Sequence, residues 1–195
     1  MTLVEKVSQW IELFGEKVTE NKDLLNKLDT AIGDGDHGSN LTRGAAAVKE
    51  KAAETDYDNL SEVFKDVGMT LVSKVGGASG PLYGSAFINM AKIAKETNDI
   101  GEILASGLEG IQKRGHAEAG EKTMVDEWIP VIEAIKNNTL SIDKIDEALN
   151  STKDMKATKG RASYLGDRSV GHIDPGAQSS AYLFEALLEA GVLDE

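Results

Sequence analysis

Three aspartates lie close together in residues 29–40, a glycine-rich stretch with the sequence DTAIGDGDHGSN. In an extended loop Asp34 and Asp36 would point the same way, and Asp29, near the end of a preceding helix, could converge on them. Two like charges about 4 Å apart repel by about 4 kcal/mol at an effective dielectric of about 20. A cation must offset this repulsion if the carboxylates meet. Because the ligands are oxygens and the chain has no cysteine, Mg²⁺ is the expected ion.

Other glycine and aspartate motifs fit this stretch less well. Residues 33–38 match G-x-G-x-x-G, but that fingerprint needs a preceding strand, and the preceding residues have a helical pattern. An EF-hand loop fails because Ala45 or Asn40 stands where its last glutamate should be. A P-loop fails because the chain has no G-K-[ST] sequence. One alternative stays open, in which Asp29 caps a helix and the other two aspartates are solvated turn residues.

A phosphate group would explain why a cation is needed at this loop. His37 to Asn40 begin a helical pattern directly after the acids, and the free amides of a helix start bind anions. Residues 76–81 and 174–176 also precede or begin expected helices. Close packing of small residues would explain the first stretch equally well, and an ordinary cap is the stronger interpretation of the second taken alone. Arg161 and Arg168 offer guanidinium groups that could meet a phosphate, or are ordinary surface residues.

The elements that must position these loops are helices. Apolar residues recur at steps of three and four almost throughout the chain, and all 3 prolines stand where helices would start. Ten of the 20 glycines fall in three short stretches, at 33–38, 76–84 and 166–176, which suggests that the backbone approaches a ligand there. No alternating pattern indicates a strand. We therefore expect an all-α fold with about eight or nine helices.

Length and composition limit the function classes. With 195 residues, a single domain over residues 1–195 is expected. The formal net charge of −12 argues against a general nucleic-acid binder, because counterion release requires a basic surface. No apolar run reaches the ~18 residues of a membrane span, and the N-terminus lacks the layout of a secretory signal, so a cytoplasmic location is expected.

Five blocks of this sequence together resemble the nucleotide-binding L subunit, or L domain, of dihydroxyacetone kinases. They are AIGDGDHGSN, GGASGPLYG, GEKTMVDEW, GRASYLGDRS and GHIDPGAQSS, in the order of that family between residues 29 and 180. The resemblance implies an antiparallel eight-helix barrel with a nucleotide site at one end. It also implies that Asp29, Asp34 and Asp36 bind two Mg²⁺ ions, which bridge to the phosphates of ADP or ATP.

The resemblance further implies a set of nucleotide contacts, which residue chemistry alone reaches only in part. The set is His37, Gly38, Ser39, Asn40, Ala78, Ser79, Gly115, Thr123, Met124, Arg161, Asp174, Pro175 and Gly176. Gly115, Thr123 and Met124 would otherwise be interpreted as a turn glycine, a helix cap and a core methionine. Arg161 is expected to stabilise charge in the transition state of phosphoryl transfer, and His37 to contact phosphate rather than act as a nucleophile.

A free-standing chain of this kind resembles the phosphoenolpyruvate-dependent bacterial kinases rather than the ATP-dependent ones, in which the domain follows a larger dihydroxyacetone-binding domain. The resemblance implies that a phosphohistidine on the M subunit of a phosphotransferase system converts bound ADP to ATP. The phosphoryl group then passes to dihydroxyacetone on a separate K subunit. A homodimer is an open option. Two other hypotheses stay open: a related kinase with a different acceptor, such as a fatty acid on a carrier protein, and a non-enzymatic helical scaffold.

Overall fold

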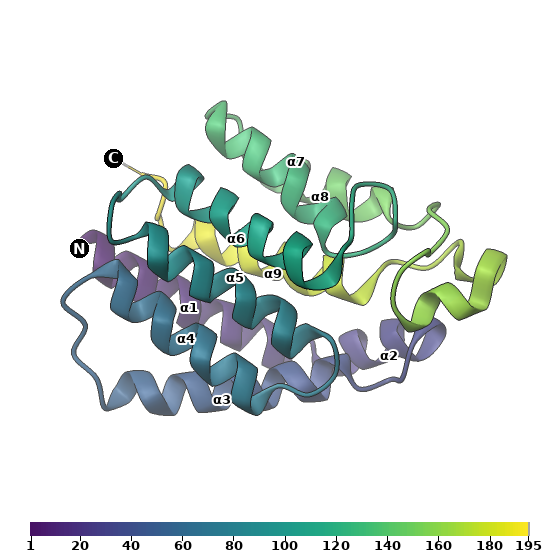
Figure 1. Cartoon of the computed structure of the whole chain (residues 1–195), viewed down its shortest axis with the longest axis horizontal. Coiled ribbons are helices and arrows are strands. Elements are labelled where there is room, and N and C mark those ends of the chain that lie inside the picture. The colour runs from purple at the N-terminus through teal and green to yellow at the C-terminus, as the bar shows by residue number, and fades with distance from the viewer. Residues whose placement is uncertain (195) are drawn as a thin grey trace.

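Helices make up all the regular structure in residues 1–194, the part of the chain that the structure, a computed structural model, describes. There are nine α-helices and one 3₁₀ segment in this range, and the predicted all-α fold is confirmed (Figure 1). Their bounds are α1 (Leu3–Glu20), α2 (Lys22–Ile32), α3 (His37–Ala53), α4 (Leu60–Lys74), α5 (Ser79–Ile93), α6 (Ile100–Gly115), α7 (Val125–Lys136), α8 (Ile142–Ser151), η1 (Arg161–Ser169) and α9 (Pro175–Glu189).

Side-chain caps explain where several helices begin. Thr2 and Glu5 form a capping box at the start of α1, in which the Thr2 hydroxyl accepts from the Glu5 amide at 3.2 Å and the Glu5 carboxylate accepts from the Thr2 amide at 2.7 Å. Asn59, Asp99 and Ser141 accept in the same way from amides in the first turns of α4, α6 and α8. These caps satisfy amides that a helix leaves without internal partners.

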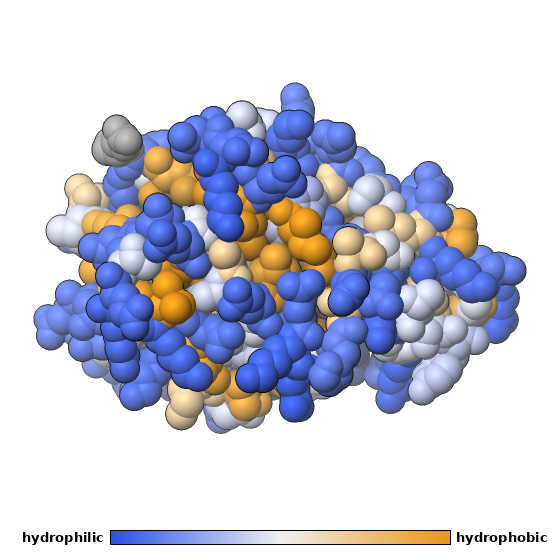
Figure 2. Space-filling view, turned by 45° about the horizontal axis from the view of Figure 1, so that its top comes forward, coloured by the Kyte–Doolittle hydropathy of each residue, from blue (hydrophilic) through white to orange (hydrophobic). Residues whose placement is uncertain are grey.

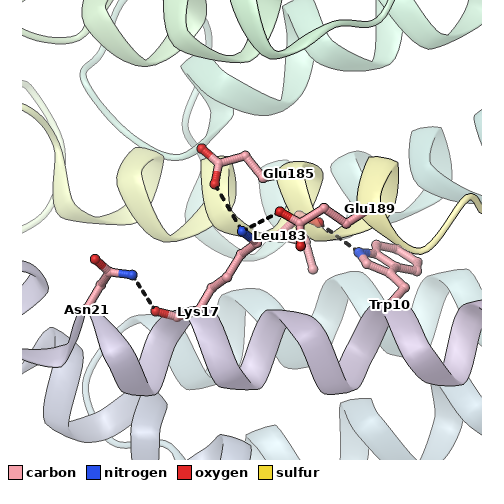
Figure 3. A network of polar contacts seen from close by, with 6 residues as sticks. All are labelled: Trp10, Lys17, Asn21, Leu183, Glu185 and Glu189. Atoms are coloured by element: carbon pink, nitrogen blue, oxygen red, sulfur yellow. Dashed lines mark hydrogen bonds and ion pairs between the residues drawn. The ribbon is translucent and has the colours of Figure 1, made fainter.

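The first and last helices lie side by side and close the bundle (Figure 3). The indole N–H of Trp10 on α1 donates to the carbonyl of Leu183 on α9 at 2.7 Å, and both residues are buried. The ammonium of Lys17 lies 2.7 Å from Glu189 and 3.7 Å from Glu185. The buried hydrogen bond fixes the register of α1 against α9, whereas the part-exposed ion pairs contribute less.

The long helices run side by side, with α4, α5 and α6 stacked in chain order and α1 packed between α3 and α9 (Figure 1). Three aromatic rings meet in the core, since Trp10 lies 6.2 Å from Phe64 and 6.4 Å from Phe87, centroid to centroid. Hydrophilic side chains dominate the face in Figure 2, with apolar residues between them. Within residues 1–194, no helix combines the length and apolar character needed to cross a membrane.

Glu127 on α7 is a buried acid without a partner. Its side chain has 0% exposure, and neither carboxyl oxygen has a hydrogen-bond partner among the described residues. Burial, together with the nearby carboxylates of Asp146 on α8 and Glu185 on α9, raises the pKa of Glu127 to about 9. The side chain is therefore a neutral carboxylic acid at neutral pH.

We predict that Glu127→Gln makes the stability of the fold less sensitive to pH. The folded-state pKa of about 9 exceeds the ordinary value of the unfolded chain. Between these two values the unfolded chain releases a proton that the folded chain keeps, so the free energy of unfolding of the wild type falls as pH rises. Chemical denaturation at about pH 5 and about pH 8 measures this decrease in the free energy of unfolding. The decrease should be larger in the wild type than in the variant by more than about 1 kcal/mol.

Glu133→Gln is the matched control, because Glu133 lies on the same helix but is exposed. It should retain the pH dependence of the wild type. Equal pH dependence in Glu127→Gln and the wild type would contradict the prediction.

Candidate functional site

The loops that carry the predicted site residues gather at one end of the molecule (Figure 1). The loop between α2 and α3, the start of α5, the segment before α7, η1 and the start of α9 all lie there. α2 contacts α3, α9 and η1, which fixes the acidic loop against the last two elements of the chain. The antiparallel order of the helices thus brings together residues that are far apart in the sequence.

Asp29 organises the acidic loop. One oxygen of its carboxylate, Oδ2, accepts from the backbone amides of Asp36 at 2.9 Å and His37 at 3.0 Å. Gly33 leaves room for this arrangement, because a Cβ at that position would lie 2.2 Å from the other oxygen, Asp29 Oδ1. Asp36 is the N-cap residue of α3 but makes no side-chain cap, and Asp34 Oδ1 lies 3.1 Å from Nε of Arg161.

The three aspartates lie at the junction of α2 and α3, Asp29 in the last turn of α2 and Asp34 and Asp36 in the loop after it, without forming a closed ligand set. In residues 1–194, no group of three or more histidine, aspartate or glutamate side chains is arranged to hold a metal ion. The chemistry of the donors nevertheless fits a hard cation, because all are carboxylate oxygens and the Asp36 side chain makes no capping bond. The only counter-charge on Asp34 among the ion pairs of the described residues is Arg161, whose side chain is 73% exposed. Metal binding by Asp29, Asp34 and Asp36 stays a prediction.

The start of α3 differs in part from the expected set of free amides. The amide of His37 is bonded to Asp29, and the amide of Ser39 donates to Oδ1 of Asn26 at 3.0 Å. The Nδ2 group of Asn26 also donates to the Ser39 hydroxyl at 3.0 Å. Gly38 permits this contact with α2, since a Cβ there would lie 2.1 Å from the Lys22 carbonyl oxygen. Side chains of α2 thus already cap much of this helix start.

His37 is buried, with 8% exposure, and its Nε2 lies 2.9 Å from the hydroxyl of Ser179 on α9. Burial lowers the pKa of His37 to about 4, although the negative charges of Asp29 and Asp36 act in the opposite direction. The imidazole is therefore neutral at neutral pH. It can donate or accept a hydrogen bond, but it does not supply positive charge to a phosphate.

A chain of buried hydrogen bonds runs from His37 across the core. The Tyr83 hydroxyl lies 2.6 Å from the Ser179 hydroxyl and 2.9 Å from the Ser180 hydroxyl, and the Trp128 indole N–H donates to Ser180 at 3.0 Å. Because an indole N–H can only donate, Ser180 accepts from it and can donate a hydrogen bond to Tyr83, which then donates to Ser179. The chain links α3, α5, α7 and α9 at the base of the site.

The start of α5 lies beside the start of α3. Asn40 on α3 faces the glycines before α5, since a Cβ on Gly76 would lie 3.1 Å from Asn40 Oδ1. Ala78 is the N-cap residue of α5 and Ser79 its first residue, and no side chain caps this helix start. Gly115, at the end of α6, packs against Leu82 in the first turn of α5.

The start of α9 contributes a second buried acid. Asp174 caps this helix by accepting from the Ala177 amide at 2.9 Å. Burial raises the pKa of Asp174 to about 7, while the hydrogen bond from Ala177 and the charge of Lys122 lower it. Gly176 lies against Met124, so that the segment before α7 and the start of α9 are in contact. Thr123 adjoins this contact, and its amide donates to Asp126 at 3.0 Å.

Sequence reasoning missed several residues that hold this end together. Asn26, Tyr83, Lys122, Asp126 and Ser179 were not in the predicted set. Tyr83, Lys122, Asp126 and Ser179 lie within the motif blocks, which is the signal that could have identified them. Asn26 lies outside the blocks and carries no such signal, because its role depends on a partner brought close by the fold.

The chain is similar to a domain family and to several known proteins. The DAK2 domain family model matches residues 31–189. The ADP-binding subunit of PEP-dependent dihydroxyacetone kinase 1 from Listeria innocua is 56% identical over 188 residues, which cover 94% of this chain and 95% of the relative. The ADP-binding subunit of the PTS-dependent dihydroxyacetone kinase from Lactococcus lactis is 53% identical over 189 residues, with 97% and 98% coverage.

A solved structure is similar over one part of its length. The dihydroxyacetone kinase of C. freundii superimposes with a TM-score of 0.76 and 26% identity, covering 92% of this chain and 33% of that chain. A second structure of that kinase, in complex with AMP-PNP and Mg²⁺, gives the same TM-score of 0.76. The chain thus spans a third of the length of the C. freundii kinase but nearly the whole of the two subunits above.

We predict that Tyr83→Phe weakens the base of the site. Removal of the hydroxyl breaks the chain between Ser180 and Ser179 in a fully buried environment, which should lower the free energy of unfolding by about 1–3 kcal/mol. The same change should shift the imidazole NMR signals of His37, because Ser179 loses one of its partners.

Tyr182→Phe on α9 makes the same chemical change at a buried residue whose hydroxyl lies outside this chain of hydrogen bonds, and it serves as the control. If Tyr83→Phe and Tyr182→Phe had equal effects on stability and on the His37 signals, the hydrogen-bond chain would not contribute specifically to either, and the prediction would be wrong.

Proposed function

Because this chain belongs to the DAK2 domain family, we propose that it is the ADP-binding subunit of a phosphoenolpyruvate-dependent dihydroxyacetone kinase. The observation that carries the proposal is the end-to-end correspondence with ADP-binding subunits, which reaches 97% of this chain and 98% of the relative from Lactococcus lactis. The chain is then a kinase subunit, a phosphotransferase component, that forms one nucleotide-binding domain over residues 1–195.

The helix starts support binding of an anionic nucleotide at this end of the molecule. The starts of α3, α5 and α9 lie there together, and each presents the positive end of a helix dipole. The proposed nucleotide contacts are His37, Gly38, Ser39, Asn40, Ala78, Ser79, Gly115, Thr123, Met124, Arg161, Asp174, Pro175 and Gly176. Since His37 is neutral and buried, its ring would act as a hydrogen-bonding group in the wall of the site.

We propose that two magnesium ions are held by Asp29, Asp34 and Asp36. Bound magnesium neutralises charge on the transferring phosphoryl group. Asp29 is held in place by the amides of Asp36 and His37, so this carboxylate is already oriented. The carboxylates of Asp34 and Asp36 are not engaged in helix capping and could turn toward a cation.

Arg161 is the proposed charge-stabilising residue. Its guanidinium is paired with Asp34 at 3.1 Å and is 73% exposed, so little holds it in that place except this carboxylate. When Asp34 serves a cation, the guanidinium loses its partner and becomes available to a phosphate oxygen. Arginine suits this role, because its planar fork matches phosphate geometry and remains charged at all relevant pH values.

The partners follow from the subunit character of the family. A phosphohistidine on a phosphotransferase-system M subunit would give up its phosphoryl group to the β-phosphate of ADP, with cleavage of a P–N bond and formation of a P–O bond. The terminal phosphoryl group would then pass to a hydroxyl of dihydroxyacetone on a K subunit. The P–O bond to the β-phosphate would break and regenerate ADP, a P–O bond to the hydroxyl oxygen would form, and that hydroxyl would lose its proton. We also propose a cytoplasmic location and leave a homodimer as an option for solution measurement.

We predict that the freshly purified protein contains ADP, detected by ultraviolet absorbance and mass spectrometry. With a K subunit, dihydroxyacetone, phosphoenolpyruvate and the phosphotransferase proteins, it should form product without releasing this ADP. Rapid loss of the nucleotide, together with full activity on free ATP, would contradict the relay. Binding of ADP can be measured as a rise in melting temperature, because a ligand that binds the folded state stabilises it. If ADP with Mg²⁺ gave no such rise, the proposed function itself would be contradicted.

We predict that Asp36→Ala lowers ADP affinity in the presence of Mg²⁺ by at least about tenfold, because a cation ligand is lost. The helical signal in circular dichroism should stay unchanged, since the Asp36 carboxylate makes no capping bond to α3. Asp143→Ala removes an equal charge from an exposed position on α8 and should bind ADP like the wild type. Equal affinities in the two variants would rule out Asp36 as a ligand.

A further inference from the structure

Lys122 stands in the block GEKTMVDEW, where a lysine would ordinarily be interpreted as a phosphate-binding cation. The structure engages its ammonium elsewhere. The side chain is 1% exposed, and Nζ donates to the backbone carbonyls of Thr152 and His172, with the carbonyl of Lys153 at 3.4 Å. An ammonium has three hydrogens, and three carbonyl oxygens surround this one.

These carbonyls belong to two stretches of chain that the ammonium joins. Thr152 and Lys153 follow the end of α8, and His172 lies just before the start of α9. The residues between them form a long excursion that carries η1 and therefore Arg161. We infer that Lys122 is a positioning residue that closes the base of segment 153–172 and so sets Arg161 and the start of α9 in place for the nucleotide, an inference that rests on the proposed function.

Backbone and side-chain hydrogen bonds close the same base. The amide of Gly171 donates to the carbonyl of Lys153 at 2.7 Å, and the amide of Asp174 donates to the Thr152 hydroxyl at 3.1 Å. The excursion thus leaves and returns at one point, as in an Ω-loop. Thr152 has 0% exposure, so water cannot readily replace these bonds.

The conformation of Lys122 itself indicates that its surroundings hold it firmly. Its φ of 64° lies in the left-handed region, which a long side chain adopts only where the structure enforces it. On one side the ammonium is fixed by the three carbonyls. On the other side Asp126 accepts from the amides of Gly120 at 2.6 Å and Thr123 at 3.0 Å.

Hydrogen bonds to backbone carbonyls hold the ammonium in place, although the net effect of its surroundings is to lower the pKa of Lys122. Burial lowers the pKa of Lys122, whereas the carboxylates of Asp174, Asp154 and Asp126 raise it. The carbonyls of Thr152 and Lys153 lie at the C-terminal end of α8, which carries the negative end of a helix dipole and favours a cation. With all three hydrogens engaged, the group has none left for a phosphate oxygen and no free lone pair to act as a base.

Beyond its base, the excursion has few anchors. The Thr158 amide donates to the Glu121 carbonyl at 3.3 Å, and Arg161 pairs with Asp34 at 3.1 Å. Within the excursion the Ala157 amide donates to the Ser169 hydroxyl at 2.9 Å. Tyr164 is 86% exposed. Release of the base should therefore loosen the whole segment while the packed core of α4, α5 and α6 stays intact.

The test compares Lys122→Met with Lys153→Met. Methionine keeps the apolar stem of Lys122 but removes the three donors, and Lys153 is an exposed lysine beside the same base. In nucleotide-free protein, amides of residues 153–174 should exchange with solvent at least about tenfold faster in Lys122→Met than in Lys153→Met or the wild type. ADP affinity should fall at least about tenfold in Lys122→Met alone.

Two results would overturn the inference. Weaker ADP binding with unchanged exchange in the nucleotide-free protein would make Lys122 a phosphate contact, and unchanged binding with unchanged exchange would leave it no role. If Lys122→Met does not fold, Thr152→Val removes the acceptor for the Asp174 amide, together with the local donor to the Leu149 carbonyl, and should speed exchange of residues 172–176. Unchanged exchange there would equally refute a closed base. A wild type that binds no ADP would refute the proposed function, while the exchange comparison would still decide the role of Lys122.

Discussion

The antiparallel order of the helices places the N-terminal ends of α3, α5, α7 and α9 at one end of the molecule, and the candidate site depends on this arrangement (Figure 1). Every helix start leaves backbone amides without internal partners and carries the positive end of a dipole. A chain with a net charge of −12 thereby acquires one region in which negative charge is stabilised. Such a region suits phosphate groups, provided that the nearby carboxylates do not occupy all the amides.

Aspartates already bind a large share of these amides. Asp29 accepts from two amides at the start of α3, Asp174 caps α9, and Asp126 binds two amides before α7. Phosphates and carboxylates would therefore compete for the same amides and repel one another. Divalent cations relieve this conflict, because they bind carboxylates and phosphates together. The close association of acids with helix starts thus makes a metal-dependent nucleotide site more reasonable than a site built on amides alone.

A feature of the fold or the site could be predicted from the sequence where it depends on residues that are close together in the chain. Helical periodicity and the acidic loop are local features, so the all-α fold and the cluster of aspartates could be predicted from residue order. The role of Tyr83 is not local, because its hydroxyl meets Ser179, which lies 96 positions later in the chain. Lys122 is similar, since its partners lie up to 50 positions away. The unpartnered burial of Glu127 follows from the packing of α7 against α8 and α9, which no single stretch of sequence encodes.

Lys122 and Arg161, two of the basic residues at this end of the molecule, differ in role because they differ in burial. Lys122 is 1% exposed and surrounded by carbonyls, whereas the Arg161 side chain is 73% exposed and has one carboxylate beside it. A buried, fully bonded cation cannot change partners without leaving acceptors unsatisfied, so it suits a fixed structural position. An exposed ion pair is weak, and its members change partners easily. This suits a group that contacts a phosphate only during transfer. On this reasoning the fold holds the segment of Arg161 rigidly at its base and leaves its guanidinium free to move.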